Sequence, residues 1–212
     1  MNFFVTGTDT DVGKSYVCKY LAKEFCKTGK KTGYLKPFQS GLEPNIDPDA
    51  KGVEKTAPNV LAKSSYVTNT PCTPLISSKI AKVEYDLSKV KKDFEELKNS
   101  CDITIVEGSG GLYVPVKKNV LMSDVIKFLN LPIIIVARAN LGTINHTLMT
   151  IKCAQADNIE ILGVVISNYP KETSDPATIY AKEMIEGFCS VKVLDVIYNN
   201  QTDFSNLAQK LI

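Results

Sequence analysis

The sequence lacks the features that mark several classes of protein. Its 212 residues include one histidine and six cysteines, and no two cysteines have the Cys-x-x-Cys spacing of a metal site or redox pair. Several cysteines lie among apolar residues, where free thiols pack as small hydrophobic side chains, and this favours a reducing compartment. No apolar stretch approaches the length that spans a bilayer, and residues 1–5 carry no basic region of a signal peptide. We therefore expect a cytoplasmic protein with no membrane partner.

An excess of charge of one sign is also missing. The 25 basic and 23 acidic residues leave a net charge of +2, which provides no broad basic surface, so we expect no nucleic-acid partner. Internal repeats and low-complexity segments are absent from the sequence as well. The length fits one domain that can bury a sizeable apolar core, so we predict a single domain over residues 1–212.

Short apolar runs alternate with helical patterns along most of the chain. This alternation predicts an α/β fold, a mostly parallel β-sheet flanked by helices on both faces. The run at residues 133–136 has no polar alternation, as expected for a central strand covered on both sides. The predicted strands are residues 2–6, 32–36, 102–107, 132–138, 161–167 and 191–197.

Helical spacing of apolar residues defines the connecting segments. Leu87, Val90, Phe94 and Leu97 recur every three or four residues and form one stripe of a helix. The serine-, threonine- and proline-rich segment 64–78 is predicted to be a loop. The other predicted helices are residues 15–28, 123–129, 143–156 and 176–188.

The strongest motif is GTDTDVGKS at residues 7–15, between a predicted strand and a predicted helix. Backbone N–H groups of such a loop bind phosphates, the helix amino terminus favours the same negative charge, and Lys14 can reach the β- and γ-phosphates. The Ser15 hydroxyl is then available to Mg²⁺. Five residues separate Gly7 from Gly13, one more than in the ordinary Walker A spacing. A strand-to-helix turn without phosphate binding is the less favoured alternative.

Acidic residues near glycines suggest a metal site. Glu107 ends a predicted strand and precedes the sequence GSGG, so its carboxylate should lie at the carboxyl edge of the sheet, beside the phosphate loop. Mg²⁺ commonly binds one or two carboxylates together with phosphate oxygens. The alternative is an exposed acid before a flexible turn. Asp49, with Asp47 two residues before it, is the next candidate, and a solvated loop acid is an equal alternative there.

A second lysine is predicted at the same edge. Lys36 ends a predicted strand just before Pro37, where a fixed turn can direct its side chain, although most lysines are simply exposed. The polar residues of segment 38–41 could bind a substrate. His146, the single histidine, is more typical of a helix cap or a buried hydrogen-bonding group than of a catalyst.

Four segments together resemble the dethiobiotin synthetase family of P-loop NTPase-like ligases. They are FVTGTDTDVGK at residues 4–14, KPFQSG at 36–41, VEGSGG at 106–111 and LGTINH at 141–146. They occur in the family's order over about four-fifths of the chain. The longer phosphate loop and the KPFQSG segment are specific, whereas the glycine turns alone are not.

The resemblance implies an enzyme of biotin biosynthesis. Its substrates would be 7,8-diaminopelargonate, CO₂ and ATP, its cofactor Mg²⁺, and its products dethiobiotin, ADP and phosphate. It also implies a homodimer in which each site is completed across the interface, by a helix start that receives the substrate carboxylate. The implied catalytic residues are Lys14 and Lys36, and the implied metal ligands are Ser15, Asp49 and Glu107. Implied substrate-binding residues are Thr10, Ser40, Gly142 and Asn145. Implied nucleotide-binding residues are Asp11, Val12, Gly13, Lys14, Ser15, Tyr16, Glu107, Gly108, Ser109, Gly110 and the base-reading Asn168.

The chain departs from the family pattern at three places. Ser15 stands where threonine is more usual and keeps the hydroxyl group. The segment between Gly41 and Asp49 is shorter than expected, which leaves the choice between Asp49 and Asp47 open. The region after Asp195 is also short, and because it forms part of the base pocket in this family, we expect weak discrimination between ATP and other triphosphates.

Two other functions are less favoured. A nucleotide switch of the partitioning or cell-division type usually has an additional lysine early in the phosphate loop, and residues 8–11 contain none. Such a switch often carries a basic amphipathic terminal helix, which we also do not find. An amide-forming ligase acting on a corrinoid acid would need a glutamine-hydrolysing domain, for which the chain has neither the length nor a Cys-His-acid arrangement.

Overall fold

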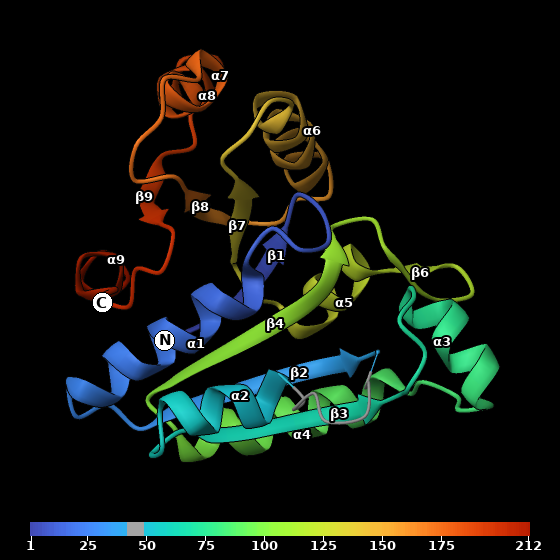
Figure 1. Cartoon of the computed structure of the whole chain (residues 1–212). Helices are drawn as coiled ribbons and strands as arrows, with labels where there is room; N and C mark the ends of the chain where they lie inside the picture. The colour runs from blue at the N-terminus through green and yellow to red at the C-terminus, as the bar shows by residue number, and fades with distance from the viewer. Residues whose placement is uncertain (42–48) are drawn as a thin grey trace.

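A parallel sheet forms the centre of the computed structural model (Figure 1). The structure describes residues 1–41 and 49–212, and within them seven strands form one sheet in the order β3-β2-β4-β1-β7-β8-β9, all paired in parallel. A small antiparallel pair, β5–β6, lies apart from it. The strands are β1 (Asn2–Gly7), β2 (Thr32–Gln39), β3 (Leu61–Val67), β4 (Ile103–Gly111), β5 (Pro115–Lys117), β6 (Val120–Leu121), β7 (Ile133–Arg138), β8 (Ile161–Tyr169) and β9 (Val193–Tyr198).

Helices cover both faces of this sheet, which confirms the predicted fold class. Side chains alternate along each strand, so Phe3 and Val5 pack into one apolar core and Phe4 packs into the other. One face is covered by α1 (Lys14–Lys27), α2 (Asp49–Thr56) and α9 (Ser205–Gln209). The opposite face is covered by α4 (Leu87–Ser100), α5 (Met122–Leu129), α6 (Thr143–Ala156) and α8 (Ala181–Phe188). The short helices are α3 (Pro74–Ala81) and α7 (Pro176–Ile179).

The predicted loop at residues 64–78 is wrong. Most of it forms the end of β3 and the first turns of α3. β3 is an edge strand whose side chains are mostly half-exposed, so serine and threonine fit there without a buried apolar pattern. Pro74 begins α3, a position where proline suits a helix because its missing N–H has no partner in the first turn.

Several predicted boundaries also change, and three of these changes matter for the site or for the helix count. β2 continues through Pro37 to Gln39, because its pairing with β3 goes on after its pairing with β4 ends at Leu35. β4 continues through the glycine-rich segment to Gly111, so these residues extend a strand and are not a flexible turn. The predicted helix at 176–188 is divided at Tyr180 into α7 and α8.

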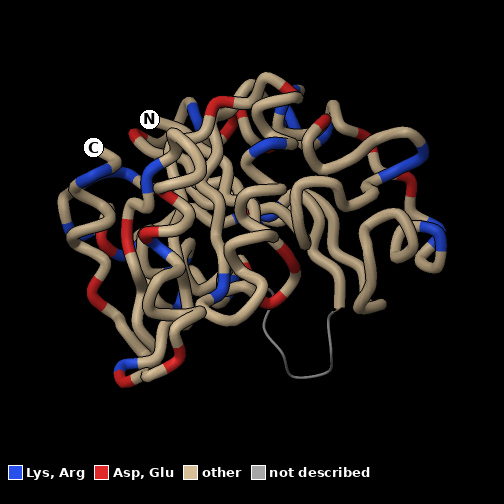
Figure 2. The backbone as a smooth tube through the Cα atoms, turned by 90° about the horizontal axis from the view of Figure 1, so that it is seen from above, with Lys and Arg blue, Asp and Glu red and all other residues tan. Residues whose placement is uncertain are grey.

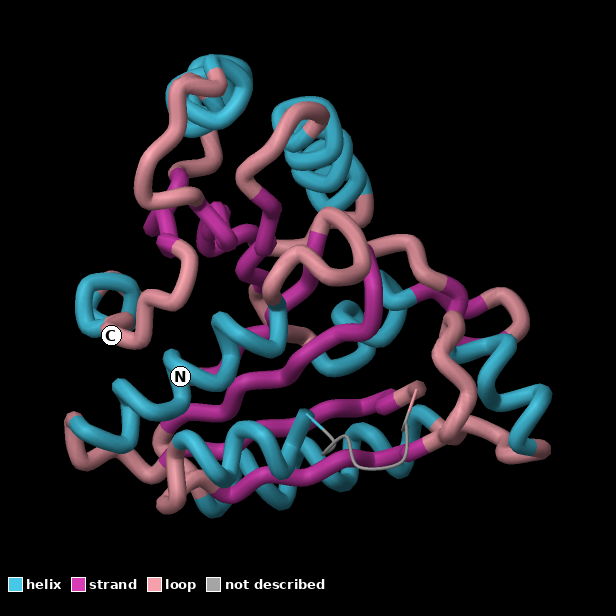
Figure 3. The backbone as a smooth tube through the Cα atoms, viewed as in Figure 1, coloured by secondary structure: helices cyan, strands magenta, loops and turns pink. Residues whose placement is uncertain are grey.

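The strand order brings three loops to one edge of the sheet. β1 lies between β4 and β7, and the chain leaves β1 for α1 before returning to β2 on the far side of β4. Figure 3 shows the loop between β1 and α1 next to the end of β4. Ligands of parallel α/β sheets bind at such an edge, where the strand order reverses.

Basic and acidic residues are interspersed along the backbone (Figure 2). All six cysteines are free. Among the described residues, no helix combines the length and the apolar character needed to cross a membrane.

Candidate active site

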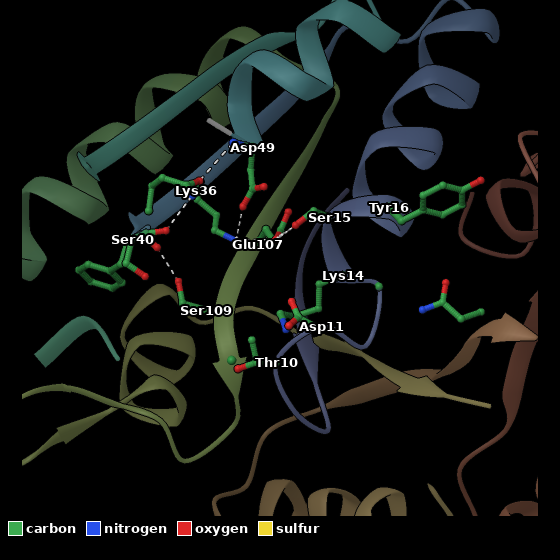
Figure 4. Close-up of a pocket in the computed structure, with 15 residues that line it drawn as sticks. Thr10, Asp11, Lys14, Ser15, Tyr16, Lys36, Ser40, Asp49, Glu107 and Ser109 are labelled. Carbon is green, nitrogen blue, oxygen red and sulfur yellow. Dashed lines mark hydrogen bonds and ion pairs between the residues drawn. The ribbon is translucent and has the colours of Figure 1, made fainter. Parts of the chain in front are cut away.

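A cavity of about 440 Å³ lies at the edge where β1, β2 and β4 end. It brings together the phosphate loop, both predicted lysines and both predicted acids (Figure 4). Most of the predicted site residues contribute to its wall. The lining residues are Thr10, Asp11, Gly13, Lys14, Ser15, Tyr16, Lys36, Phe38, Gln39, Ser40, Asp49, Glu107, Ser109, Gly110 and Asn168.

The phosphate loop adopts a conformation that requires glycine at position 13. Gly13 caps α1 with a φ of 99°, in the left-handed region that disfavours side chains. A Cβ at this position would also collide with the Ser167 hydroxyl at the end of β8. Gly13 therefore allows the loop to pass close to β8 and to present its backbone to the cavity.

Lys14 lies buried at the start of α1, with 7% of its surface exposed. Its ammonium group donates a hydrogen bond to the Asp9 carbonyl, 2.9 Å away, so it folds over the loop. Burial lowers the pKa of Lys14, and the positive charge of Lys36 lowers it further. Both lysines line the same cavity; their shared catalytic role stays a prediction.

Arg138, a residue that sequence reasoning missed, holds the phosphate loop from the end of β7. Its guanidinium lies 2.9 Å from the Asp9 carboxylate and donates to the Thr10 carbonyl at 3.2 Å. The sequence carried only part of the signal: Arg138 ends a predicted strand, but its partner Asp9 lies 129 residues away along the chain.

Glu107 is fully buried, and its carboxylate has a donor on each oxygen. Oε1 accepts hydrogen bonds from Ser15 Oγ at 2.6 Å and from Lys36 Nζ at 2.5 Å. Oε2 accepts one from the Tyr34 hydroxyl at 2.6 Å. Burial and the charge of Glu107 raise the pKa of Tyr34 well above its usual value, so Tyr34 remains a donor. Sequence reasoning missed Tyr34.

Strand register explains how these groups meet. Leu35 of β2 lies opposite Val106 of β4, so Lys36 and Glu107 follow at neighbouring positions. Tyr34 is two residues before Lys36 and points to the same face, because side chains alternate along a strand. This two-residue spacing was the sequence signal for Tyr34. It identifies the Tyr34–Glu107 contact only once β2 is known to pair with β4.

Lys36 bridges two carboxylates. Its Nζ lies 2.8 Å from Asp49 Oδ2, at the start of α2, and 2.5 Å from Glu107 Oε1 (Figure 4). Burial acts to lower the pKa of Lys36, but the negative charges of Glu107 and Asp49 outweigh burial and raise it above the ordinary value. Lys36 therefore carries a positive charge at neutral pH.

The same oxygens are of the type that could hold a magnesium ion. Ser15 Oγ lies 2.6 Å from Glu107 Oε1, and the Asp49 and Glu107 carboxylates both lie within 2.8 Å of Lys36 Nζ, so the three side chains gather at the place that the Lys36 ammonium group occupies. Mg²⁺ usually takes one or two carboxylates and completes its shell with phosphate oxygens and water. Asp47, the alternative to Asp49, lies outside the described residues.

Some predicted residues lie elsewhere. Val12 has a fully buried side chain, and Gly108 packs against the Phe4 ring, so neither lines the cavity. Gly142 and Asn145 lie at the amino end of α6, also outside it. Their predicted roles remain predictions.

Two further sequence readings concern the cavity wall and the histidine. Gln39, which with Phe38 belongs to the predicted polar segment, accepts a hydrogen bond from the Asp49 backbone and joins β2 to α2. His146 is exposed on α6, so the prediction of a cap or buried group is wrong. His146 and its neighbour Asn145 lie on the exposed side of α6, whereas Thr143 and Thr147 of the same turns are buried.

Known proteins resemble this chain over most of its length. A family profile described as an AAA domain matches residues 1–202. The ATP-dependent dethiobiotin synthetase of Methanococcus vannielii is 39% identical, over 95% of this chain and 94% of that protein. The ATP-dependent dethiobiotin synthetases of Endomicrobium trichonymphae and Bacillus subtilis strain 168 are 37% and 35% identical, over 94% and 92% of this chain and 94% and 85% of those proteins.

Solved structures show a similar fold at low sequence identity. The cell division ATPase MinD of Pyrococcus furiosus has a TM-score of 0.63 and 15% identity, over 100% of this chain and 98% of that one. Cobyrinic acid a,c-diamide synthase of Mycobacterium smegmatis, solved with ADP and magnesium, has a TM-score of 0.61 and 12% identity, over 100% and 92%. These two likenesses concern the P-loop NTPase fold alone. The 35–39% identity to the synthetases, over nearly the whole length, places the chain in the dethiobiotin synthetase family.

Proposed function

We propose that this protein is a magnesium-dependent dethiobiotin synthetase that uses ATP, CO₂ and 7,8-diaminopelargonate. The observation that carries the proposal is the meeting of Lys14, Lys36 and Glu107 around one cavity beside the phosphate loop. A phosphate tail placed there meets two ammonium groups, backbone donors and a carboxylate pair. The identity to the named synthetases supports the same reaction.

The reaction begins with a carbamate, formed when one amine of the substrate adds to CO₂. The γ-phosphoryl group of ATP then passes to a carbamate oxygen, which releases ADP and leaves a mixed anhydride. Negative charge collects on oxygen atoms throughout, so fixed cations and backbone donors supply most of the catalysis. Lys14 and Lys36 stabilise this charge in our proposal, since both ammonium groups belong to the cavity wall. Mg²⁺ at Ser15, Asp49 and Glu107 would neutralise charge on the phosphates.

Ring closure needs the second amine next to the anhydride. A second cavity of about 490 Å³ adjoins the first, and the two share five lining residues: Thr10, Asp11, Ser40, Ser109 and Gly110. It extends toward the amino end of α3, and Ser40 is held there by its hydrogen bond to the Cys72 carbonyl at 3.0 Å. We propose that the diamine occupies this second cavity, with its carbamate beside Thr10 and Ser40. The amine attacks the anhydride carbon, and phosphate leaves.

A second copy of the chain completes the site in this proposal. Gly142 and Asn145 lie outside both cavities at the start of α6. The same region exposes Leu141 and Met149, with 85% and 56% of their surfaces accessible. Exposed apolar side chains of this size suit a protein interface. We therefore propose a homodimer in which the α6 amino terminus of one subunit binds the substrate carboxylate of the other, and we place the enzyme in the cytoplasm.

Nucleotide recognition is proposed at the far end of the first cavity. Asn168 and Tyr16 line that end, and the Tyr16 hydroxyl donates to the Gln201 carbonyl at 2.7 Å, which ties the short segment after β9 to α1. The prediction of weak base discrimination remains open to test. Comparing turnover with ATP, GTP and CTP at equal concentration tests it, and a strong preference for ATP rejects it.

The proposed function is tested by phosphate release. Purified protein is supplied with ATP, Mg²⁺ and bicarbonate, with and without 7,8-diaminopelargonate. Phosphate release that requires the diamine, together with dethiobiotin identified by mass spectrometry, is the expected result. Hydrolysis of ATP that ignores the diamine contradicts the proposal and favours a nucleotide switch.

A further inference from the structure

The carboxylate of Glu107 has one side toward the cavity and one side toward the core. Oε1 meets Ser15 and Lys36, which both line the cavity. Oε2 meets the Tyr34 hydroxyl, and Tyr34 is fully buried and absent from the cavity wall. The two oxygens are therefore held by groups of different kinds.

The bonds on the cavity side compete with ligands. In the proposed function, Ser15 would offer its hydroxyl to the metal ion and Lys36 would offer its ammonium group to the transferred phosphoryl group. Each would then give up part of its hydrogen bonding to Glu107. The Tyr34 bond does not compete, because its ring packs in the core formed by α1, α2 and the strands, out of reach of a ligand in the cavity.

We propose that Tyr34 is a positioning residue that fixes the Glu107 carboxylate for the metal ion. This inference rests on the proposed magnesium site and deepens it. Tyr34 touches neither metal nor substrate, and it acts by keeping Oε2 bound to the core while Oε1 faces the cavity. Without the hydroxyl, the carboxylate can rotate, and a buried acceptor loses its partner. Hydrogen-bonding partners behind metal ligands typically contribute about 10–100-fold to metal affinity.

Tyr34→Phe isolates the hydroxyl, and Tyr85→Phe is its matched control. Tyr85 is another buried tyrosine, 2% exposed, which belongs to the core on the opposite face of the sheet and lies outside the first cavity. Calorimetric titration with ADP is carried out with Mg²⁺ and, after chelation, without it. We expect Tyr34→Phe to weaken the Mg²⁺-dependent gain in ADP affinity by about tenfold, while ADP affinity without Mg²⁺ stays as in the parent protein. Tyr85→Phe should leave both values unchanged.

A double variant tests whether Tyr34 acts through Glu107. Glu107→Gln removes the charged ligand, so adding Tyr34→Phe to it should change the Mg²⁺ dependence no further, because coupled residues are not additive. Equal losses of ADP affinity with and without Mg²⁺, an additive double variant, or no change in Tyr34→Phe would each overturn the inference. A lower thermal midpoint with an intact Mg²⁺ gain would also overturn it, since Tyr34 would then support only the fold.

The outcome is separable from that of the proposed function. These titrations contain neither diamine nor bicarbonate, so a wrong substrate assignment leaves them unaffected. If diamine-dependent phosphate release is observed but Tyr34→Phe keeps the full Mg²⁺ gain, the positioning role alone fails. If the parent protein itself shows no Mg²⁺ gain, the magnesium site and the role of Tyr34 fail together.

Discussion

The carboxyl edge of β1, β2 and β4 and the amino end of α6 treat their polar groups differently. The first pairs them with one another within one chain, and the second exposes them to solvent. At the first region, Lys36, Asp49 and Glu107 are joined by contacts of 2.5–2.8 Å, and Glu107 is fully buried. At the second, Leu141 is 85% exposed and Asn145 faces solvent. The polar groups of the first region are paired with one another within one chain, whereas those of the second face solvent. In our proposal, one chain therefore supplies the phosphate chemistry and a second copy supplies the remaining substrate contact.

Removing the Lys36 ammonium group, which pairs with both carboxylates of the first region, should have the largest effect. Lys36→Ala should lower turnover by roughly 10²–10³-fold, as loss of one group that stabilises developing charge does. Nucleotide affinity should stay largely intact, because the phosphate loop and Lys14 remain. Turnover and ADP titration measure the two effects. Lys63→Ala, which removes an ion-paired lysine on β3, serves as control. Near-normal turnover in Lys36→Ala would remove Lys36 from the catalytic residues.

A substitution at the amino end of α6 tests whether this region contributes to the active site of a second subunit. Asn145→Ala should lower kcat/KM for the diamine by about 10–100-fold, since a hydrogen bond to a charged group contributes roughly 1.5–3 kcal/mol. ADP affinity should not change. Mixing Asn145→Ala with Lys36→Ala chains should then restore activity, because a mixed dimer has one site with both residues intact. If the mixture is no more active than the mean of its two components, the site is not shared between subunits.

A substitution at Gly13 tests whether nucleotide binding depends on the backbone conformation of the phosphate loop. Gly13→Ala should weaken ADP binding by at least about tenfold, because an alanine at a φ of 99° stores about 1–3 kcal/mol of strain and its Cβ collides with the Ser167 hydroxyl. Gly52→Ala is the matched control, since a Cβ there meets no atom within 4 Å. Titration with ADP measures both variants. Equal affinities would show that the loop adapts without loss.

The smallest effect is expected at Asp93, whose ion pairs support the fold and lie outside the active site. Burial acts to raise the pKa of Asp93 on α4, but hydrogen bonds from Lys63 and Lys89 outweigh it and hold that pKa below the usual value. Asp93 therefore stabilises the fold at pH above its unfolded pKa, and this stability is lost as pH falls through the lowered pKa. Asp93→Asn should cost about 1 kcal/mol at pH 7, with a smaller difference at acid pH and unchanged turnover. Urea unfolding at both pH values measures this.

Much of the site was visible in the sequence because its parts follow strands. GTDTDVGKS lies between a strand and a helix, and Lys36 and Glu107 end two other predicted strands. In a parallel sheet these ends share one edge, so convergence could be predicted without coordinates. The loop predicted at 64–78 was wrong because composition does not distinguish a polar edge strand from a loop.

Tyr34 and Arg138 could not be assigned from the sequence, for a different reason. Each acts on a residue far away along the chain, Tyr34 on Glu107 and Arg138 on Asp9. Their roles depend on which strands are neighbours in the sheet, and local sequence patterns do not give the order of the strands. His146 was misjudged for the same reason, since its exposure depends on what covers α6.

By itself, the sequence determined the parallel α/β class, the phosphate loop and the chemistry of the residues that end its strands, because hydrophobic period and glycine placement are local properties. Only the tertiary structure decided that β2 lies beside β4, that Lys36 neutralises two carboxylates at once, and that Tyr34 supports Glu107 from within the core. Those facts depend on contacts between segments up to 73 residues apart, whose free energy is set by burial and pairing in three dimensions.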